Sequence, residues 1–114
     1  MTATNGERRL ISFVLPVYDE EANLEELHAK ITDVMRGRDD DYEMVFVDDG
    51  SKDGSIGVLS RLRRDDARIR IVQLRRNFGK AAAYSAGFSH ARGEITITMD
   101  TDISVSSGPA PGVK

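Results

Sequence analysis

Four short apolar runs alternate along the chain with three segments of helical character. The runs are rich in β-branched and aromatic residues and are predicted as strands at residues 10–15, 42–47, 69–74 and 94–99. The segments between them are predicted as helices at residues 23–36, 55–64 and 79–91. This alternation predicts an α/β fold, a Rossmann-like three-layer sandwich in which helices cover the faces of a mainly parallel sheet.

The first helix has the clearest boundaries. Asn23 is a favourable N-cap, and Glu26 three residues later completes a capping-box-like pattern. Gly37 stands where a helix commonly ends in a glycine. We expect Glu26 and Lys30 to form an i,i+4 ion pair on the solvent side. One apolar stripe is expected to face the sheet, formed by Leu24, Leu27, Ile31, Val34 and Met35.

Composition narrows the functional classes. With a net charge of −3 and a pI of about 5.3, the chain is not a generally basic nucleic-acid binder. It has no cysteine, so disulfides and thiolate metal sites are excluded. No apolar run is long enough to cross a bilayer, and the polar first residues do not resemble a signal peptide. These features predict a cytoplasmic protein.

Two groups of residues have an ordinary structural interpretation. Seven arginines fall between Arg61 and Arg76, and we interpret them first as a solvated face. Contact with an anionic membrane surface, a phosphate or a nucleic acid is the alternative for that segment. His28 and His90 lie on predicted helices with no other ligand residue near them in the pattern, which favours surface or packing roles.

Polar clusters follow every predicted strand at its carboxyl end, where open parallel sheets bind ligands. The clusters are Tyr18, Asp19 and Glu20, then Asp48 and Asp49, then Arg75, Arg76 and Asn77, and finally Asp100 and Asp102. Acidic groups from three strand ends are therefore expected to share one crevice. The segment 48–51 can also be a simple turn, because Asp, Gly and Ser are turn formers.

The spacing of the last two acids favours a metal site. In an extended backbone Asp100 and Asp102 point the same way and Thr101 points away. Two such carboxylates repel unless a proton or cation lies between them, and Mg²⁺ or Mn²⁺ suits oxygen ligands. Two acids at this spacing also occur by chance as solvated loop residues. Because the glycine-rich phosphate motifs are absent, a nucleotide here would be held by acids, a metal and strand ends.

Four motifs occur in a familiar order: FVLPVYDEEANL at 13–24, VFVDDGSKDGS at 45–55, RRNFGKAAAYSAGF at 75–88 and ARGEITITMDTD at 91–102. Together they resemble the amino-terminal half of a family 2 glycosyltransferase of the GT-A fold. The likeness is greatest to the branch that loads sugars onto polyprenyl phosphates, the dolichol-phosphate mannosyltransferase-like enzymes. It covers about residues 10–103.

The resemblance implies roles for the residues at matching positions. Pro16, Tyr18 and Glu20 would line the nucleotide pocket. Asp49 would accept a hydrogen bond from the base, and Asp48 would shape the turn beside it. The D-x-D motif, Asp100 and Asp102 with Thr101 between them, would meet the ribose, the diphosphate and the metal and so carry the catalytic function. Looser phosphate contacts are implied for Arg76, Asn77 and Lys80.

The implied reaction transfers a sugar, with inversion, from a UDP- or GDP-sugar to a polyprenyl phosphate, assisted by Mg²⁺ or Mn²⁺. The longer relative would work in the cytoplasm or at the cytoplasmic face of a membrane. The alternatives are a family 2 enzyme of polysaccharide or cell-wall glycan synthesis and a non-catalytic nucleotide-binding remnant. A signal-receiver domain is a weaker alternative, since acidic strand ends occur there too.

The sequence departs from the family pattern after the D-x-D motif. Residues 1–9 form a polar segment, residues 10–103 the nucleotide-sugar-binding half of the domain, and residues 104–114 a Ser/Gly/Pro tail unlike the family. We expect the fold to be incomplete at its carboxyl end, through a frameshift, a broken gene or the end of a cloned fragment. With the strands in the order 3-2-1-4, the fourth becomes an exposed edge that favours self-association.

Overall fold

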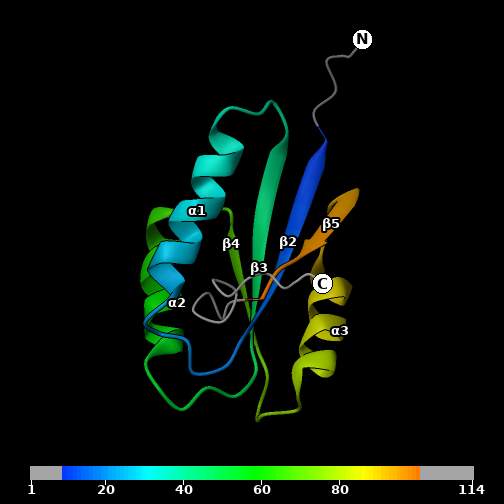
Figure 1. Cartoon of the computed structure of the whole chain (residues 1–114). Coiled ribbons are helices and arrows are strands. Elements are labelled where there is room, and N and C mark those ends of the chain that lie inside the picture. The colour runs from blue at the N-terminus through cyan, green and yellow to red at the C-terminus, as the bar shows by residue number, and fades with distance from the viewer. Residues whose placement is uncertain (1–8, 101–114) are drawn as a thin grey trace, which may run out of the picture.

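The strands and helices alternate as the sequence predicts. A computed structural model describes residues 9–100. The elements along the chain are β2 (Leu10–Val17), α1 (Leu24–Arg36), β3 (Asp41–Asp48), α2 (Ser55–Asp65), β4 (Ile69–Gln73), α3 (Lys80–His90) and β5 (Ile95–Thr98) (Figure 1). The strands form one parallel sheet in the order β4-β3-β2-β5. This is the 3-2-1-4 order expected from the sequence.

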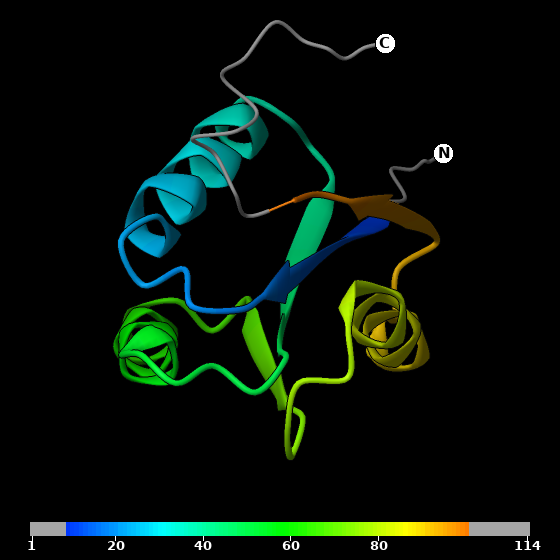
Figure 2. The ribbon, with the colours of Figure 1, turned by 60° about the horizontal axis from the view of Figure 1, so that its bottom comes forward.

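Helices cover both faces of the sheet, which makes three layers. Helices α1 and α2 lie on one face and α3 lies on the other (Figure 2). The larger core joins α1 and α2 to alternate residues of the strands, with Leu15, Leu24 and Phe46 fully enclosed. The smaller core places Ala83 of α3 against Val14, Val45 and Val47. The central strands β2 and β3 are therefore buried on both faces, as their apolar sequences predict.

Helix α3 lies unusually close to the sheet because its inner face is made of small residues. Ala83 is fully buried, and a Cβ added to Gly87 would come within 2.3 Å of a Val14 methyl carbon. The alanine-rich sequence of this helix therefore serves close helix–sheet packing. This packing also brings the amino end of α3 near the carboxyl ends of β2 and β3.

Two predictions about α1 are wrong. Asn23 lies at the start of the helix, but its side chain makes no capping hydrogen bond; it donates instead to the Glu20 carboxylate at 2.8 Å, so the capping box does not form. Val34 is 67% exposed, because the buried face of α1 runs through Ile31 and Met35 and residue 34 lies to one side of that face. The ion pair between Glu26 and Lys30 is confirmed, at 3.5 Å.

Strand β5 flanks the sheet and leads directly to the predicted D-x-D motif. Asp100 is described, but Thr101, Asp102 and the 104–114 segment lie outside the described residues. Within residues 9–100 no helix is long and apolar enough to span a bilayer. Self-association through β5 stays a prediction.

Candidate nucleotide-sugar site

A pocket of about 390 Å³ opens at the carboxyl end of the sheet. It gathers residues at the carboxyl ends of all four strands and the first residue of α3, which is where the sequence places the shared crevice. The lining residues are Pro16, Val17, Tyr18, Glu20, Asp49, Asn77, Gly79, Lys80 and Asp100. Three carboxylates and one ammonium group thus face one small volume.

Asp49 organises the loop between β4 and α3. Its side chain is almost fully buried and accepts hydrogen bonds from the Asn77 side chain at 3.1 Å and from the backbone N–H groups of Phe78 at 2.8 Å and Gly79 at 3.0 Å. The residue before α3 has φ of 102°, which glycine adopts readily. The second and third sequence motifs therefore form one structural unit.

The hydrogen bonds to Asp49 also limit which groups at the amino end of α3 can bind a ligand. Backbone N–H groups at a helix start commonly bind anions. Here the Asp49 carboxylate already accepts the N–H groups of Phe78 and Gly79. The anion-binding capacity near these two groups is therefore used inside the protein, and the exposed cation at this helix end is the Lys80 side chain.

Gly50 allows the β3 and β4 loops to touch. A Cβ at this position would lie 2.5 Å from the backbone of Arg76 and Asn77, and its φ is 76°. Beside it, Asp48 accepts a hydrogen bond from the Ser51 N–H at 3.2 Å, a contact that fits the turn-shaping role implied for this residue. Asp48 is 1% exposed and lies beneath the pocket rather than in its lining. Its other carboxylate oxygen has no hydrogen-bond partner among residues 9–100.

The loop after β2 is held by the loop after β3. The Asp19 carboxylate accepts the Lys52 N–H at 2.7 Å, and the Asp19 N–H donates to the Ser51 hydroxyl at 2.9 Å. Asp19 has φ of 52°, uncommon for a residue with a side chain. The next residue is fixed too, because the Glu20 N–H donates to the Ser55 hydroxyl at 3.0 Å. This clasp holds Tyr18 and Glu20 at the pocket mouth.

Hydrogen bonds in this clasp also stabilise the ionised form of Asp53. Slight burial raises the pKa of Asp53, but hydrogen bonds from the Ser55 side chain and backbone and from the Glu21 N–H outweigh it. The resulting pKa lies below the ordinary value. Asp53 therefore remains an acceptor for the loop at neutral pH.

Lys80 and Asp100 form an ion pair in the lining of the pocket. The Lys80 ammonium nitrogen lies 3.0 Å from an Asp100 carboxylate oxygen, and both side chains are about half exposed. Nearby, partial burial and the charge of Asp100 raise the pKa of the Tyr84 hydroxyl, while Lys80 opposes the shift. The site therefore presents a cation and a carboxylate that a charged ligand can reach.

Most of the residues implied by the resemblance meet in this pocket. They are Pro16, Tyr18, Glu20, Asp49, Asn77, Lys80 and Asp100. Arg76 is exposed and outside the lining; its guanidinium lies 4.3 Å from the Phe78 ring centroid. Thr101 and Asp102 lie outside the described residues. Val17 and Gly79 also line the pocket, although the sequence pattern does not predict them as site residues. Both lie next to predicted site residues in the sequence, and this adjacency is the signal that points to them.

The histidines take no part in the pocket. His28 on α1 contacts the Asp66 carboxylate at 2.8 Å, and His90 contacts the Ala86 carbonyl oxygen at 2.9 Å. Burial raises the pKa of Asp66, but the interactions with His28 and the Arg68 N–H lower it below its ordinary value. Both histidines have the structural roles expected from the sequence.

The oxygen donors around the pocket suit a hard divalent cation only if a ligand completes the coordination shell. Within residues 9–100 no group of three or more acidic or histidine side chains is close enough to hold a metal alone. Magnesium typically takes one or two protein carboxylates and fills its remaining positions with water and phosphate oxygens. Asp100 lies in the lining of the pocket and can supply one such carboxylate.

Comparison with known protein families shows which family this chain belongs to. The model for the family named "Glycosyl transferase family 2" matches residues 12–109. The chain belongs to glycosyl transferase family 2. This membership removes the signal-receiver alternative.

The sequence relatives of this family 2 chain include proteins named as undecaprenyl-phosphate sugar transferases. It is 43% identical over 95 residues to the undecaprenyl-phosphate 4-deoxy-4-formamido-L-arabinose transferase of Pseudomonas paraeruginosa, a match of 82% of the chain and 28% of the relative. It is 42% identical over 93 residues to an uncharacterised glycosyltransferase of Synechocystis, covering 82% and 29%. The chain thus spans less than a third of the length of these curated relatives.

Similar solved structures share its α/β architecture. The mannosyltransferase PcManGT of Pyrobaculum calidifontis, in complex with GDP-Man and Mn²⁺, superposes with a TM-score of 0.75 at 30% identity, covering 84% of this chain and 28% of that one. TarS of S. aureus, in complex with UDP-GlcNAc, gives 0.70 at 25% identity, covering 81% and 26%. The fold described above is therefore the GT-A architecture over a partial length.

Proposed function

We propose that the pocket binds the nucleoside diphosphate of a nucleotide sugar together with a divalent cation, and that the protein serves glycosyl transfer. The observation that carries this proposal is the convergence of Asp49, Lys80 and Asp100 on one pocket in a family 2 chain. Two solved structures of similar fold hold GDP-Man with Mn²⁺ and UDP-GlcNAc. A diphosphate with its metal complements the mixed charge of this site.

The base would lie at the Asp49 end of the pocket. A carboxylate offers about four acceptor positions, and three protein N–H groups use three of them. One acceptor position remains for a base N–H, which both uracil and guanine can donate. Pro16 and the exposed Tyr18 ring supply apolar surface beside it.

The diphosphate would lie at the Lys80 and Asp100 end. Asp100, with Asp102 beyond the described residues, would hold the metal through carboxylate oxygens, and the Lys80 ammonium would pair with a phosphate oxygen. A bound divalent cation supplies Lewis-acid stabilisation of the charge that develops on the leaving diphosphate. Diphosphate binding would then replace the present contact between Lys80 and Asp100.

We further propose a polyprenyl phosphate as the acceptor, with the reaction at the cytoplasmic face of a membrane. Relatives named as undecaprenyl-phosphate transferases support this choice. The bond from the sugar C1 to the donor diphosphate breaks while a bond to an acceptor phosphate oxygen forms on the opposite side. That phosphate is ionised at neutral pH, so the chain needs no general base to activate it.

A thermal-shift panel tests the binding step. UDP, GDP and their sugars are added to the full chain with Mn²⁺, with Mg²⁺ or with a chelator. Because a ligand that binds only the folded state stabilises it, one nucleotide with metal should raise the Tm by about 10 °C at concentrations about a hundredfold above its Kd. No shift with any nucleotide and metal would contradict the proposal.

A transfer assay separates catalysis from binding alone. Labelled nucleotide sugar is incubated with undecaprenyl phosphate in detergent, and lipid-linked label is counted. The glycosyltransferase proposal expects metal-dependent label in the lipid phase. Nucleotide binding without labelled lipid would favour the non-catalytic alternative, and labelled oligosaccharide acceptors in place of lipid would favour glycan synthesis.

A further inference from the structure

Strand β5 carries Asp100 to the pocket, yet its own sequence does not determine its register. The strand is four residues long, pairs with β2 from Ile95 opposite Ile11 to Thr98 opposite Val14, and is largely exposed. Because isoleucine and threonine alternate in it, a two-residue shift would again place an isoleucine (Ile97) opposite Ile11 and a threonine (Thr98) opposite Ser12. Such a shift would keep the same faces apolar and polar while moving Asp100 by about 7 Å along the sheet.

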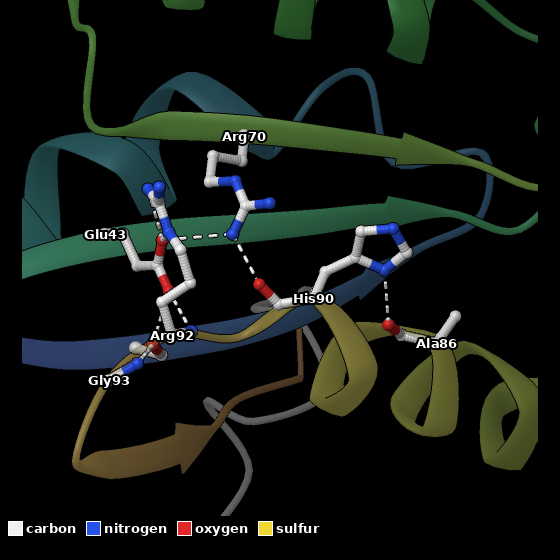
Figure 3. A network of polar contacts seen from close by, with 7 residues as sticks. Glu43, Arg70, Ala86, His90, Arg92 and Gly93 are labelled. Atoms are coloured by element: carbon white, nitrogen blue, oxygen red, sulfur yellow. Dashed lines mark hydrogen bonds and ion pairs between the residues drawn. The ribbon is translucent and has the colours of Figure 1, made fainter.

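The contacts that distinguish one register from another lie at the amino end of the sheet. The Gly93 N–H donates to the Ser12 hydroxyl oxygen at 2.8 Å, and that hydroxyl donates to the Glu43 carboxylate at 2.5 Å. The Glu94 N–H donates to the Leu10 carbonyl oxygen at 2.9 Å. Figure 3 shows Arg92 and Gly93, just before β5, gathered around Glu43 of β3.

Glu43 binds the segment before β5 through several donors. Its carboxylate accepts the Arg92 N–H at 2.8 Å and the Arg92 guanidinium at 3.1 and 3.3 Å. Arg70 of β4 reaches the same carboxylate at 3.3 Å and also donates to the His90 carbonyl oxygen at the end of α3 (Figure 3). Glu43 is 3% exposed. One buried carboxylate thus joins β3, β4, the end of α3 and the entry to β5.

Gly93 makes this arrangement specific to one register. A Cβ at residue 93 would lie 2.6 Å from the Ser12 hydroxyl oxygen and 2.7 Å from the Leu10 carbonyl oxygen. The residues on either side of it, Arg92 and Glu94, carry side chains. Sliding the strand by one or two residues would therefore force a Cβ into a space that only glycine fits.

We propose that Glu43 is a positioning residue that, through Ser12, Arg92 and Gly93, fixes the register of β5 and thereby the place of Asp100 in the pocket. The proposal rests on the proposed nucleotide site, because that site gives the position of Asp100 its consequence. Pro16 and Asp49 are held by β2, β3 and the β4–α3 loop, so they do not depend on this register. Loss of the Glu43 contacts should then impair metal-dependent binding selectively.

The test compares Glu43→Gln and Gly93→Ala with the parent chain and with the exposed control Glu26→Gln. UDP and GDP affinities are measured by titration calorimetry with Mn²⁺ and with a chelator. We expect Glu43→Gln and Gly93→Ala to reduce the enhancement by Mn²⁺ at least tenfold while the metal-free affinity changes less than about twofold. Glu26→Gln should match the parent. Equal losses with and without metal, or no loss, would overturn the proposal.

A second measurement does not depend on nucleotide binding. Amide exchange and cross-strand NMR contacts report the register directly, because the Met99 N–H donates to the Val14 carbonyl oxygen and the Glu94 N–H to that of Leu10. In Glu43→Gln these amides should exchange at least tenfold faster, with protection in β3 retained. If Gly93→Ala does not fold, Ser12→Ala replaces it. Unchanged exchange would overturn the register proposal, whereas a parent chain without nucleotide binding would contradict only the proposed function.

Discussion

Strand β3 carries a buried acid near each end, and the two acids are satisfied in different ways. Glu43, near the amino end, is surrounded by two guanidinium groups and the Ser12 hydroxyl. Asp49, just past the carboxyl end, accepts only neutral N–H groups of the loop before α3. The first acid is paired with two guanidinium groups inside the protein, whereas the second lies beside a pocket and has no cationic partner among the described residues.

This difference separates a structural from a functional carboxylate better than burial does. Both residues are 3% exposed, so burial alone does not distinguish them. What distinguishes them is whether the partners leave charge and acceptor capacity for a ligand. By that criterion the amino end of the sheet holds the strands together, and the carboxyl end is the proposed ligand-binding end.

The largest effect is expected when Glu43 is removed. Glu43→Ala would leave Arg70 and Arg92 without their shared partner and should lower the free energy of unfolding by about 3 kcal/mol. Urea denaturation at neutral pH measures it. The exposed control Glu26→Ala should change stability by less than about 0.5 kcal/mol. Equal effects of the two substitutions would remove the distinction between the buried network and the surface.

Asp49→Asn should damage binding more than folding. The amide keeps the shape but presents an NH₂ group where N–H donors now meet an oxygen, which should cost about 1–2 kcal/mol of stability. Nucleoside diphosphate affinity should fall at least tenfold, measured by calorimetry. Retained affinity in a folded variant would show that the base does not use Asp49.

Lys80→Gln should affect only the ligand. Because the Lys80–Asp100 pair is half exposed, its loss should change unfolding by less than about 0.5 kcal/mol. Affinity for a nucleoside diphosphate should fall about tenfold, and affinity for the nucleoside alone should not change. A parallel loss for the nucleoside would place Lys80 away from the phosphates.

The smallest expected effect concerns acid stability. Burial raises the pKa of Glu43, but the hydrogen bonds from Ser12, Arg92 and Arg70 outweigh it, so the folded-state pKa lies below the ordinary 4.5. Its stabilising contribution is therefore complete above the unfolded-state value and is lost as the pH falls through the folded-state value. The stability gap between the parent and Glu43→Gln should narrow below pH 4.5. A constant gap across that range would contradict the assignment.

The sequence predicts the fold well because the pattern of local segments agrees with the packing. Because β2 and β3 are apolar throughout, they are expected in the central layer of the fold. Because α3 is rich in alanine, it can pack closely on one face of the sheet. Seven residues named from the sequence line one pocket. Five of them follow strands, and parallel strands bring their carboxyl ends together; Pro16 and Lys80 come from the family resemblance. The sequence does not reveal that Asp49 is bound to the Phe78 and Gly79 backbone, because that contact depends on how two distant loops meet.

The sequence does not predict the hydrogen-bond network around Glu43, for the same reason. Ser12, Glu43, Arg70 and Gly93 lie far apart in the sequence, and only Gly93 belongs to one of the four recognised motifs. The failed capping box has a more local cause: Glu20, in the preceding loop, competes for the Asn23 side chain. Sequence periodicity therefore predicts elements, while side-chain networks between elements require the tertiary structure.

The most direct test of the separation between the two ends uses Mn²⁺ as a paramagnetic probe. Amide NMR spectra of the full chain are recorded with UDP or GDP while Mn²⁺ is added in small amounts. We expect selective broadening of the amide signals of four pocket residues, Tyr18, Gly79, Lys80 and Asp100. The amide signals of Glu43, Arg92 and Gly93 should be unaffected. Broadening centred on the Glu43 network, or no selective broadening with either nucleotide, would contradict this separation.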